Sequence, residues 1–396
     1  MKTKIRRSQL LVIGCFFGFF LFCLVWGLAQ PDRPSSAAEN RSLAQRPAMR
    51  RVVTDFGGFA RDFESYAADQ FPDREQLIGV YTALELAQGK KFARKAYCLQ
   101  GGWLLTKPAP TKPADLSALQ QALAQAGALD RPLVWCVLPL KNEALYDLEP
   151  AYFSDETGKT NKQALTAALA QVEGLTVIDA EAPLVTGTLA DREQYFYKTD
   201  FHWNARGAFA AAQDIARQLA GAGTIAETSV PQAEDFLWLE LGGEWRYQGD
   251  LNVWFSNQFS MQEDIPRYVP KNAADLRYFL HPGDIESVPR ETIIGSGLDK
   301  DPVTYNDVFT YNLGYYRVEN PDAPEAASVL ILKDSFQNAT IDYLSAIFRS
   351  VTVVDPRSYQ ETPDLASLLD ADGIDLVLFF YHQNNVSREL IDFLSA

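Results

Sequence analysis

The chain has 396 residues, of which 47% are apolar and 22% are charged, so it is long enough to bury a large folded core. Its formal net charge is −15 although its first residues are basic, and no basic stripe interleaved with aromatic residues is visible. Such an acidic chain repels phosphate backbones, which argues against a nucleic-acid partner and favours neutral or mildly charged ones.

Residues 10–29 form an uncharged apolar stretch that is long enough to cross a hydrocarbon core of about 30 Å as a helix. Four basic residues precede this stretch: Lys2, Lys4, Arg6 and Arg7. Their charge predicts that residues 1–9 are a cytoplasmic tail and that the remainder is exported, which describes a single-pass cell-membrane protein. The alternative is a signal peptide cleaved near Ala29, although the stretch is longer than the usual apolar region of about 7 to 15 residues.

Residues 30–50 are rich in proline, serine, alanine and charge, which is typical of a linker, so an extracytoplasmic domain is expected over residues 51–396. Apolar residues then recur at helical spacing from Asp55 to Gln88. Pro72 interrupts this pattern, which predicts two consecutive helices.

Two short, continuous apolar runs, residues 133–138 and 175–178, are typical of central strands of a parallel sheet. Residues 204–223 form the clearest helical pattern in the chain, with Asn204 as the expected N-cap and Gly221 near the end. His202 therefore lies just before a helix, on a connection of the kind that often carries functional groups.

The C-terminal part of the chain alternates strand and helix patterns, namely strands at 328–332, 351–354 and 376–380 and helices at 338–348 and 365–369. This alternation predicts an α/β fold whose parallel sheet is covered by helices on both faces. Ser335 directly follows the first of these strands. In open α/β sheets the ligand crevice lies at the carboxyl ends of the strands, which is where a nucleophile is useful.

Residues 236–320 differ from the rest because aromatic residues are interspersed there with glycine and proline, which predicts a β-rich insertion over the sheet. Aromatic side chains in such a segment stack on sugar rings or fill a local core, and the core is the commoner outcome. We therefore assign none of them to a site.

The exported part contains only two cysteines, Cys98 and Cys136, which either form one disulfide or, for Cys136, remain as a buried thiol in a strand. The three histidines lie far apart in the sequence, and no zinc-type spacing of ligands is present. We expect chemistry that uses no metal and no cofactor.

The sequence offers few candidates for a catalytic base, because its only histidines are His202, His281 and His382. His202 alone has an aspartate, Asp200, two residues away. A serine hydroxyl becomes a good nucleophile when a histidine takes its proton and a carboxylate orients that histidine. We therefore select Ser335, His202 and Asp200 as the candidate catalytic residues.

Each pair also has a purely structural interpretation. The Asp200–His202 pair would cap the start of a helix, and Asp334–Ser335 would form an ordinary turn at the end of a strand. His281 precedes Pro282 and Gly283 and is expected in a turn. His382 is followed by three amides, residues 383–385, which either supply an oxyanion donor or form a solvated loop.

Taken together, these motifs resemble the DHHW family and its relatives, the alginate O-acetyltransferase proteins with an SGNH-hydrolase-like fold. The segments that carry the resemblance are Glu39-Asn40-Arg41, Phe63-Glu64-Ser65-Tyr66, Asp69-Gln70-Phe71-Pro72, Gly102-Trp103-Leu104, residues 199–204 and residues 334–336. The resemblance implies the same order of residues, with the Asp-x-His pair before the serine. One departure is Lys333, which stands where the family usually has glycine before Asp-Ser.

The resemblance implies an O-acetyltransferase or acetylesterase that acts on a cell-surface or secreted polysaccharide through an acyl-serine intermediate. It also implies a membrane-bound O-acyltransferase partner that passes acetyl groups outward. The alternative, which the lysine at position 333 favours, is a catalytically silent glycan-binding or scaffolding protein of a cell-envelope polysaccharide assembly.

Overall fold

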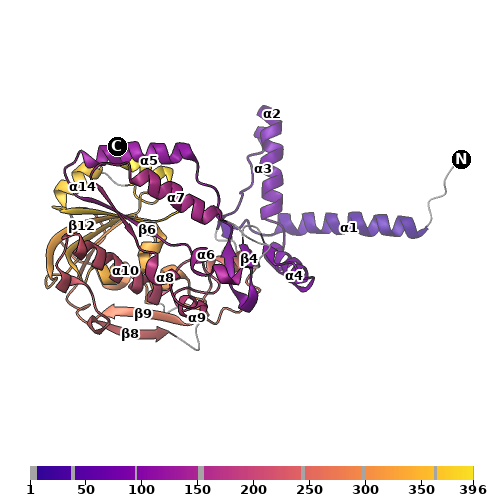
Figure 1. The fold of residues 1–396 in the computed structure, drawn as a ribbon. Coiled ribbons are helices and arrows are strands. Elements are labelled where there is room, and N and C mark those ends of the chain that lie inside the picture. Colours follow the sequence, from indigo (N-terminus) through magenta and orange to yellow (C-terminus); the bar gives the residue numbers. More distant parts are fainter. Residues whose placement is uncertain are drawn as a thin grey trace. The chain divides into compact units, whose positions relative to one another are not determined.

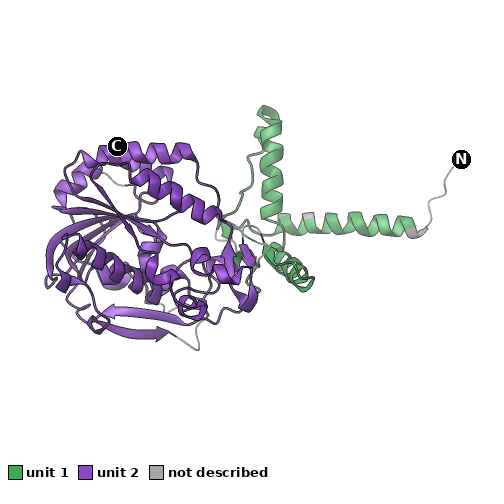
Figure 2. Ribbon diagram, viewed as in Figure 1, with its two compact units in different colours: residues 1–93, 253–258 green, residues 94–252, 259–396 purple. Residues whose placement is uncertain are grey.

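The computed structural model describes residues 7–36, 41–93, 96–149, 156–241, 246–296, 300–360 and 364–395. The basic residues at positions 2, 4 and 6 and the Glu39-Asn40 pair of the sequence analysis lie outside these ranges. The chain divides into two compact units (Figure 2), of which unit 1 comprises residues 1–93 and 253–258 and unit 2 comprises residues 94–252 and 259–396.

Unit 1 is built from helices, α1 (Arg7–Ala29), α2 (Arg51–Thr54), α3 (Phe56–Asp69) and α4 (Arg74–Ala87), with the two-residue strands β1 (Ser35–Ser36), β2 (Arg41–Ser42) and β3 (Phe92–Ala93). Pro72 lies between α3 and α4, so the predicted break is confirmed. The window Gln9–Gly27 of α1 has a mean hydropathy of 2.5, and within the described ranges α1 alone is long and apolar enough to cross a membrane.

The segment that the sequence analysis treats as a linker makes specific contacts inside unit 1. The backbone N–H of Arg33 donates to Gln70 Oε1 at 3.0 Å, and the N–H of Ala44 donates to Asp69 Oδ2 at 2.8 Å. The Tyr66 hydroxyl donates to Asp32 Oδ1 at 2.7 Å. Asp32, Arg33 and Ala44 are thus fastened to α3 and the residue that follows it, and the domain boundary at residue 51 remains a prediction.

Unit 2 is an α/β fold around a seven-stranded sheet of order β10-β11-β13-β12-β14-β6-β7 (Figure 1). Its five parallel strands are β6 (Leu133–Leu138), β7 (Leu175–Asp179), β12 (Glu325–Lys333), β13 (Phe348–Val354) and β14 (Leu376–His382). All five were predicted from the sequence as apolar runs. β7 lies at the edge of the sheet and is only partly buried, which corrects its expected central position.

Alternate residues of these strands contribute to two cores, one on each face of the sheet. Trp135 and Val137 pack with the helices α5 (Pro113–Gly127), α7 (Thr157–Leu169), α14 (Leu365–Ala371) and α15 (Arg388–Leu394). Val134 and Cys136 face α10 (Ala205–Gly221) and α13 (Ile341–Leu344). The predicted coverage of both faces is confirmed, and Cys136 is a buried free thiol.

The sheet is mixed rather than parallel throughout, which corrects the expectation for residues 236–320. Two strands of this segment, β10 (Arg277–Phe279) and β11 (Tyr315–Glu319), extend the main sheet, and β11 pairs antiparallel with β13. The other two, β8 (Phe236–Leu241) and β9 (Ile265–Pro270), form a separate antiparallel pair. An antiparallel strand added to a parallel sheet is common and needs no crossover, so the alternation of strands and helices gives no sign of it.

The helix expected over residues 338–348 is wrong in length. The chain instead forms a 3-10 helix, η6 (Ser335–Ala339), followed by the single turn α13, and β13 already begins at Phe348. β12 extends to Lys333 and β13 begins at Phe348, so residues 334–347 form the whole parallel crossover, and η6 takes up its first part.

The remaining elements of unit 2 are short connections: β4 (Ala96–Cys98), η1 (Gln100–Gly102), β5 (Leu104–Thr106), α6 (Lys141–Ala144), η2 (Tyr146–Leu148), α8 (Ala182–Val185), α9 (Leu189–Glu193), η3 (Glu227–Ser229), η4 (Ala233–Asp235), η5 (Arg290–Thr292) and α12 (Tyr305–Val308). The helix α11 (Asp250–Trp254) begins in unit 2. Most aromatic residues of the β-rich segment are buried, among them Tyr247, Tyr278, Tyr305 and Tyr316, so the core interpretation is confirmed for them.

Candidate active site

The three residues selected from the sequence meet in one hydrogen-bonded chain within unit 2. Ser335 Oγ lies 2.8 Å from His202 Nε2, and His202 Nδ1 lies 2.7 Å from Asp200 Oδ1. Ser335 is half-buried, whereas the exposed fractions of His202 and Asp200 are 3% and 0%. The arrangement has the geometry by which a histidine takes a proton from a serine hydroxyl while a carboxylate fixes its tautomer.

Four donors hold the Asp200 carboxylate in place. Oδ1 accepts from the backbone N–H of His202 at 3.0 Å as well as from its ring, and Oδ2 accepts from the Tyr247 hydroxyl at 2.9 Å and the Asp250 N–H at 3.2 Å. Burial alone would raise the pKa of Asp200, but the attraction of His202 and these hydrogen bonds hold that pKa below its usual 3.8. Asp200 is therefore a fixed, ionised partner for the imidazole.

The backbone around Asp200 is pinned by a close approach of two chain segments. The N–H groups of Leu251 and Asn252 both donate to the Thr199 carbonyl, at 3.1 and 3.2 Å. A Cβ at Gly249 would lie 2.3 Å from that carbonyl group, so only glycine permits the contact.

Lys141 of α6 supports the same loop from inside the protein. Its ammonium donates to the carbonyls of Leu104 at 2.8 Å, Lys198 at 2.9 Å and Asp200 at 2.7 Å, so all three N–H groups are used. Burial lowers the pKa of Lys141 to about 7, while the charges of Glu263 and Asp200 act in the opposite direction. The three carbonyl acceptors fit the ammonium form.

Ser335 lies directly beyond the carboxyl end of β12, at the first residue of η6. The preceding Asp334 is a structural residue: its Oδ1 accepts from the Phe336 N–H at 2.9 Å, and its Oδ2 accepts from the His382 N–H at 2.9 Å and from Asn385 Nδ2 at 3.2 Å. These bonds tie the serine turn to the end of β14.

Lys333, the departure from the family pattern, is an ordinary strand residue. It pairs with Phe380 in β12, and among the described non-glycine residues it is not one of those with positive φ. Its buried ammonium donates to Asn338 Oδ1 at 2.6 Å and lies 3.4 Å from Asp355 Oδ2. Lysine at this position therefore requires no strained backbone, and its side chain stabilises η6 through the hydrogen bond to Asn338.

Aromatic side chains enclose the imidazole. The Tyr305 ring stacks on the His202 ring at 3.9 Å between centroids with an interplanar angle of 6°, and Phe201 lies on it at 4.0 Å. Trp203 joins the two halves of the site, because its Nε1 donates to the Phe336 carbonyl at 2.9 Å. Two neighbouring predictions are confirmed: Asn204 caps α10 by accepting from the N–H groups of residues 206 and 207, and His281 lies in a turn closed by Asp284.

The amides after His382 do not form a solvated loop. Gln383 is fully buried and its Nε2 donates to the Gly158 carbonyl at 3.0 Å, Asn384 Oδ1 accepts from Asn161 at 2.6 Å, and the Asn385 amide bonds to Asp334. These bonds give the amides of Gln383 and Asn385 structural duties. A pocket of about 70 Å³ borders this region, and its lining includes Phe201, Leu251, His382 and Asn384.

Asp200, His202 and Asp250 each offer a ligand atom within 4.8 Å of the others, which is a spacing that metal sites also have. Both ring nitrogens of His202 are, however, already engaged, one with Asp200 and one with Ser335. A metal at this place would have to displace the hydrogen-bonded chain, so the donor set fits a proton relay better than a metal centre.

Sequence reasoning missed the supporting residues Lys141, Tyr247, Asp250 and Tyr305. Each is distant in sequence from the residue it supports and stands in no motif of its own. The one available signal was the clustering of aromatics in residues 236–320, and it does not separate a wall of the site from an ordinary core.

Fold and site together define an α/β protein in which a serine, a histidine and an aspartate form one hydrogen-bonded chain. The family model described as "SGNH hydrolase-like domain, acetyltransferase AlgX" matches residues 102–275, a stretch that contains Asp200 and His202. The chain's resemblance to this group of proteins is thereby confirmed.

Solved structures agree at the level of the fold. Bacillus cereus PatB1 aligns at a TM-score of 0.63 and 22% identity over 75% of this chain and 99% of that one, and a second PatB1 structure, with a sulfonyl adduct, gives the same TM-score. A DHHW family protein from Eubacterium siraeum aligns at a TM-score of 0.58 and 17% identity over 76% of this chain and 94% of that one. No curated protein matches the sequence.

Proposed function

We propose that this chain is a membrane-anchored, extracytoplasmic O-acetyltransferase or acetylesterase that acts on a cell-surface or secreted polysaccharide through an acyl-serine intermediate. One observation carries the proposal, the continuous hydrogen-bonded chain from Ser335 Oγ through His202 to Asp200, with separations of 2.8 and 2.7 Å. The match of residues 102–275 to an acetyltransferase family model supports the same chemistry.

The first half-reaction forms the acyl-enzyme. His202 Nε2 accepts the hydroxyl proton as Ser335 Oγ attacks the carbonyl carbon of the acyl donor, and the imidazolium then gives that proton to the departing oxygen. Asp200, held ionised by its four donors, stabilises the imidazolium in between. The backbone N–H of Ser335 makes no hydrogen bond to any group in the described residues, which leaves it available to the developing oxyanion.

In the second half-reaction a sugar hydroxyl gives its proton to His202 Nε2 and attacks the acyl carbonyl, and Ser335 Oγ leaves and regains the proton from the imidazolium. With water in place of the sugar the same steps make the protein an esterase.

The site is proposed to lie outside the membrane, with α1 as the anchor and a membrane-bound O-acyltransferase as the source of acetyl groups. The apolar window Gln9–Gly27 supports the anchor. The acidic character of the chain supports a neutral or weakly charged glycan acceptor rather than a polyanion.

The chemistry is tested by incubating the full chain with an aryl acetate and candidate oligosaccharides, followed by mass spectrometry of the Ser335 peptide. We expect a mass increase of one acetyl group on this peptide, its transfer to a sugar or to water, and loss of both in Ser335→Ala. Reaction with a serine-directed phosphonate is expected for the wild type alone. A wild-type chain that neither turns over nor reacts with the phosphonate would contradict the proposal.

The alternative, a silent glycan-binding or scaffolding protein, rested on Lys333 in place of glycine. Because this lysine sits in regular strand backbone, it gives that alternative little support. Binding of oligosaccharide with unchanged affinity by Ser335→Ala, in the absence of any turnover by the wild type, would favour it again.

A further inference from the structure

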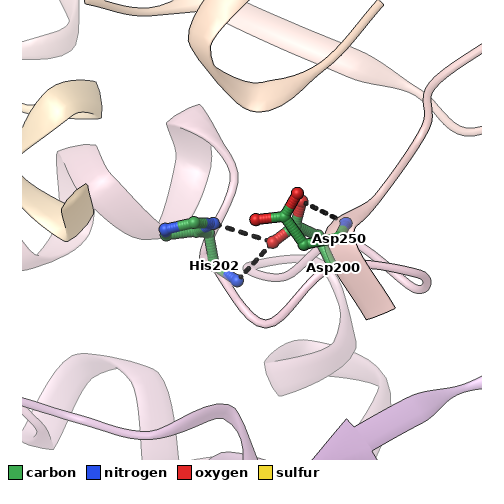
Figure 3. Close-up of side chains that lie close together, drawn as sticks. All are labelled: Asp200, His202 and Asp250. Carbon is green, nitrogen blue, oxygen red and sulfur yellow. Dashed lines mark hydrogen bonds and ion pairs between the residues drawn. The ribbon is translucent and has the colours of Figure 1, made fainter. Parts of the chain in front are cut away.

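Asp250, the first residue of α11, brings a second carboxyl group to the acid side of the site. Its backbone N–H donates to Asp200 Oδ2 at 3.2 Å, and Figure 3 shows its side chain beside that of Asp200, on the same side of His202. A carboxylate oxygen of Asp250 lies within 4.8 Å of one on Asp200 and of a His202 ring nitrogen.

The Asp250 carboxyl has no structural duty that accounts for this position. Within the described ranges its oxygens accept no hydrogen bond and join no ion pair, although the group is mostly removed from solvent. The neighbouring Gly249 packs closely against the Thr199 backbone, which places the Asp250 backbone beside Asp200. An unpaired carboxyl held in a site by its own backbone requires an explanation.

Electrostatics gives that explanation. Burial and the nearby charge of Asp200 raise the pKa of Asp250 to about 6, and the attraction of His202 opposes the rise. The other titratable groups around the pair are the hydroxyls of Tyr247, Tyr197 and Tyr305 and, behind the Asp200 loop, Lys141 with Glu263. The acid side of the site can therefore hold one or two negative charges near neutral pH.

We propose that Asp250 is a positioning residue that acts through its charge on His202. As a second acid beside Asp200, it makes His202 a stronger base and stabilises the imidazolium formed in each half-reaction. It acts through His202 and does not touch the reacting atoms. The inference rests on the proposed function only for its kinetic consequence, because the charge acts on the imidazole whether or not a substrate turns over.

The decisive variant is Asp250→Asn, which keeps the backbone N–H to Asp200 and the size of the side chain and removes only the charge. The matched control is Asp275→Asn, which removes one negative charge from an exposed position of the same unit. Both are made in the full chain and compared with the wild type from pH 5 to 9.

In the kinetic experiment the readout is kcat/KM for release of acetate from an aryl acetate. Removal of a charge about 5 Å from the imidazole should move the acid limb of the profile of Asp250→Asn to lower pH by about one unit. A weaker base should also reduce the plateau by roughly tenfold, without an increase in KM. Profiles of Asp250→Asn and wild type that superimpose after scaling would overturn the inference.

An NMR titration of the His202 ring protons separates this inference from the proposed function. The chain has three histidines, so the His202 signals are assigned with a His202→Gln variant. The midpoint of the His202 titration should fall by about one unit in Asp250→Asn and should not change in Asp275→Asn. An unchanged midpoint overturns the proposed role of Asp250. A shifted midpoint in a protein that shows no turnover contradicts the proposed enzymatic function but supports the electrostatic coupling between Asp250 and His202.

Discussion

At Lys141, burial opposes the positive charge that three carbonyl acceptors need. Replacement by methionine keeps its apolar stem but leaves the carbonyls of Leu104, Lys198 and Asp200 without their donor and Glu263 without its nearby cation. We expect Lys141→Met to lose about 3 kcal/mol of unfolding free energy at pH 6, measured by urea denaturation. Lys271→Met, at an exposed position, serves as the control, and equal midpoints for both variants would contradict this account.

Asp250 also predicts a pH dependence of stability. Its pKa is raised from 3.8 to about 6 in the folded chain, so its ionisation costs stability progressively as the pH rises from 4 to about 6, and the cost remains above that. Asp250→Asn should therefore be more stable than the wild type at pH 8, by about 2 kcal/mol after allowance for partial exposure, and no more stable at pH 4. Thermal unfolding at the two pH values checks the sign.

Replacement of Lys333 by glycine, the residue that the family usually has at this position, should destabilise the protein. Lys333→Gly removes a fully buried side chain and its bonds to Asn338 and Asp355, and it brings no relief because the backbone there is regular. A loss of at least about 3 kcal/mol in chemical denaturation is expected. Lys333→Met, which retains the packing of the stem, should lose less, and a glycine variant as stable as the wild type would reject this interpretation.

At the scale of elements, α10 couples folding to the site because its cap lies two residues beyond His202. Asn204→Ala removes the acceptor for the N–H groups of residues 206 and 207 and should cost about 1 kcal/mol. Ser387→Ala, which removes the corresponding cap of the remote α15, should cost about as much. We expect kcat to fall in the first variant only, and an equal loss of kcat in both would mean that the effect is general destabilisation.

The same scale explains what the sequence could and could not predict. Strands such as Leu133–Leu138 are buried on both faces, so their continuous apolar runs are recognisable, and α10 shows both its period and its cap. The added strands β10 and β11 and the connection after Ser335 depend on which strands become neighbours. That information lies in contacts between distant segments, as do the contacts of Lys141 and Asp250, and no local pattern carries it.

At the scale of the whole molecule, α1 predicts where the protein is found. The full chain should sediment with membranes after carbonate extraction, and a chain that begins at Gln30 should remain in the supernatant, because the apolar window Gln9–Gly27 is absent from it. The intact mass of the membrane-bound protein distinguishes an anchor from a cleaved signal. A full chain recovered only in the supernatant, with residues 1–29 still attached, would contradict the anchor.

Asp200 and His202 share one turn of chain, whereas Ser335 follows a strand more than a hundred residues further on, beyond the β-rich segment. An activated hydroxyl therefore exists only after both halves of unit 2 have come together. A reagent that modifies this hydroxyl would measure the amount of folded protein. An antibody against a linear epitope would measure the total amount of protein synthesised. Their ratio, followed after a pulse of synthesis, would time the maturation of the protein in living cells.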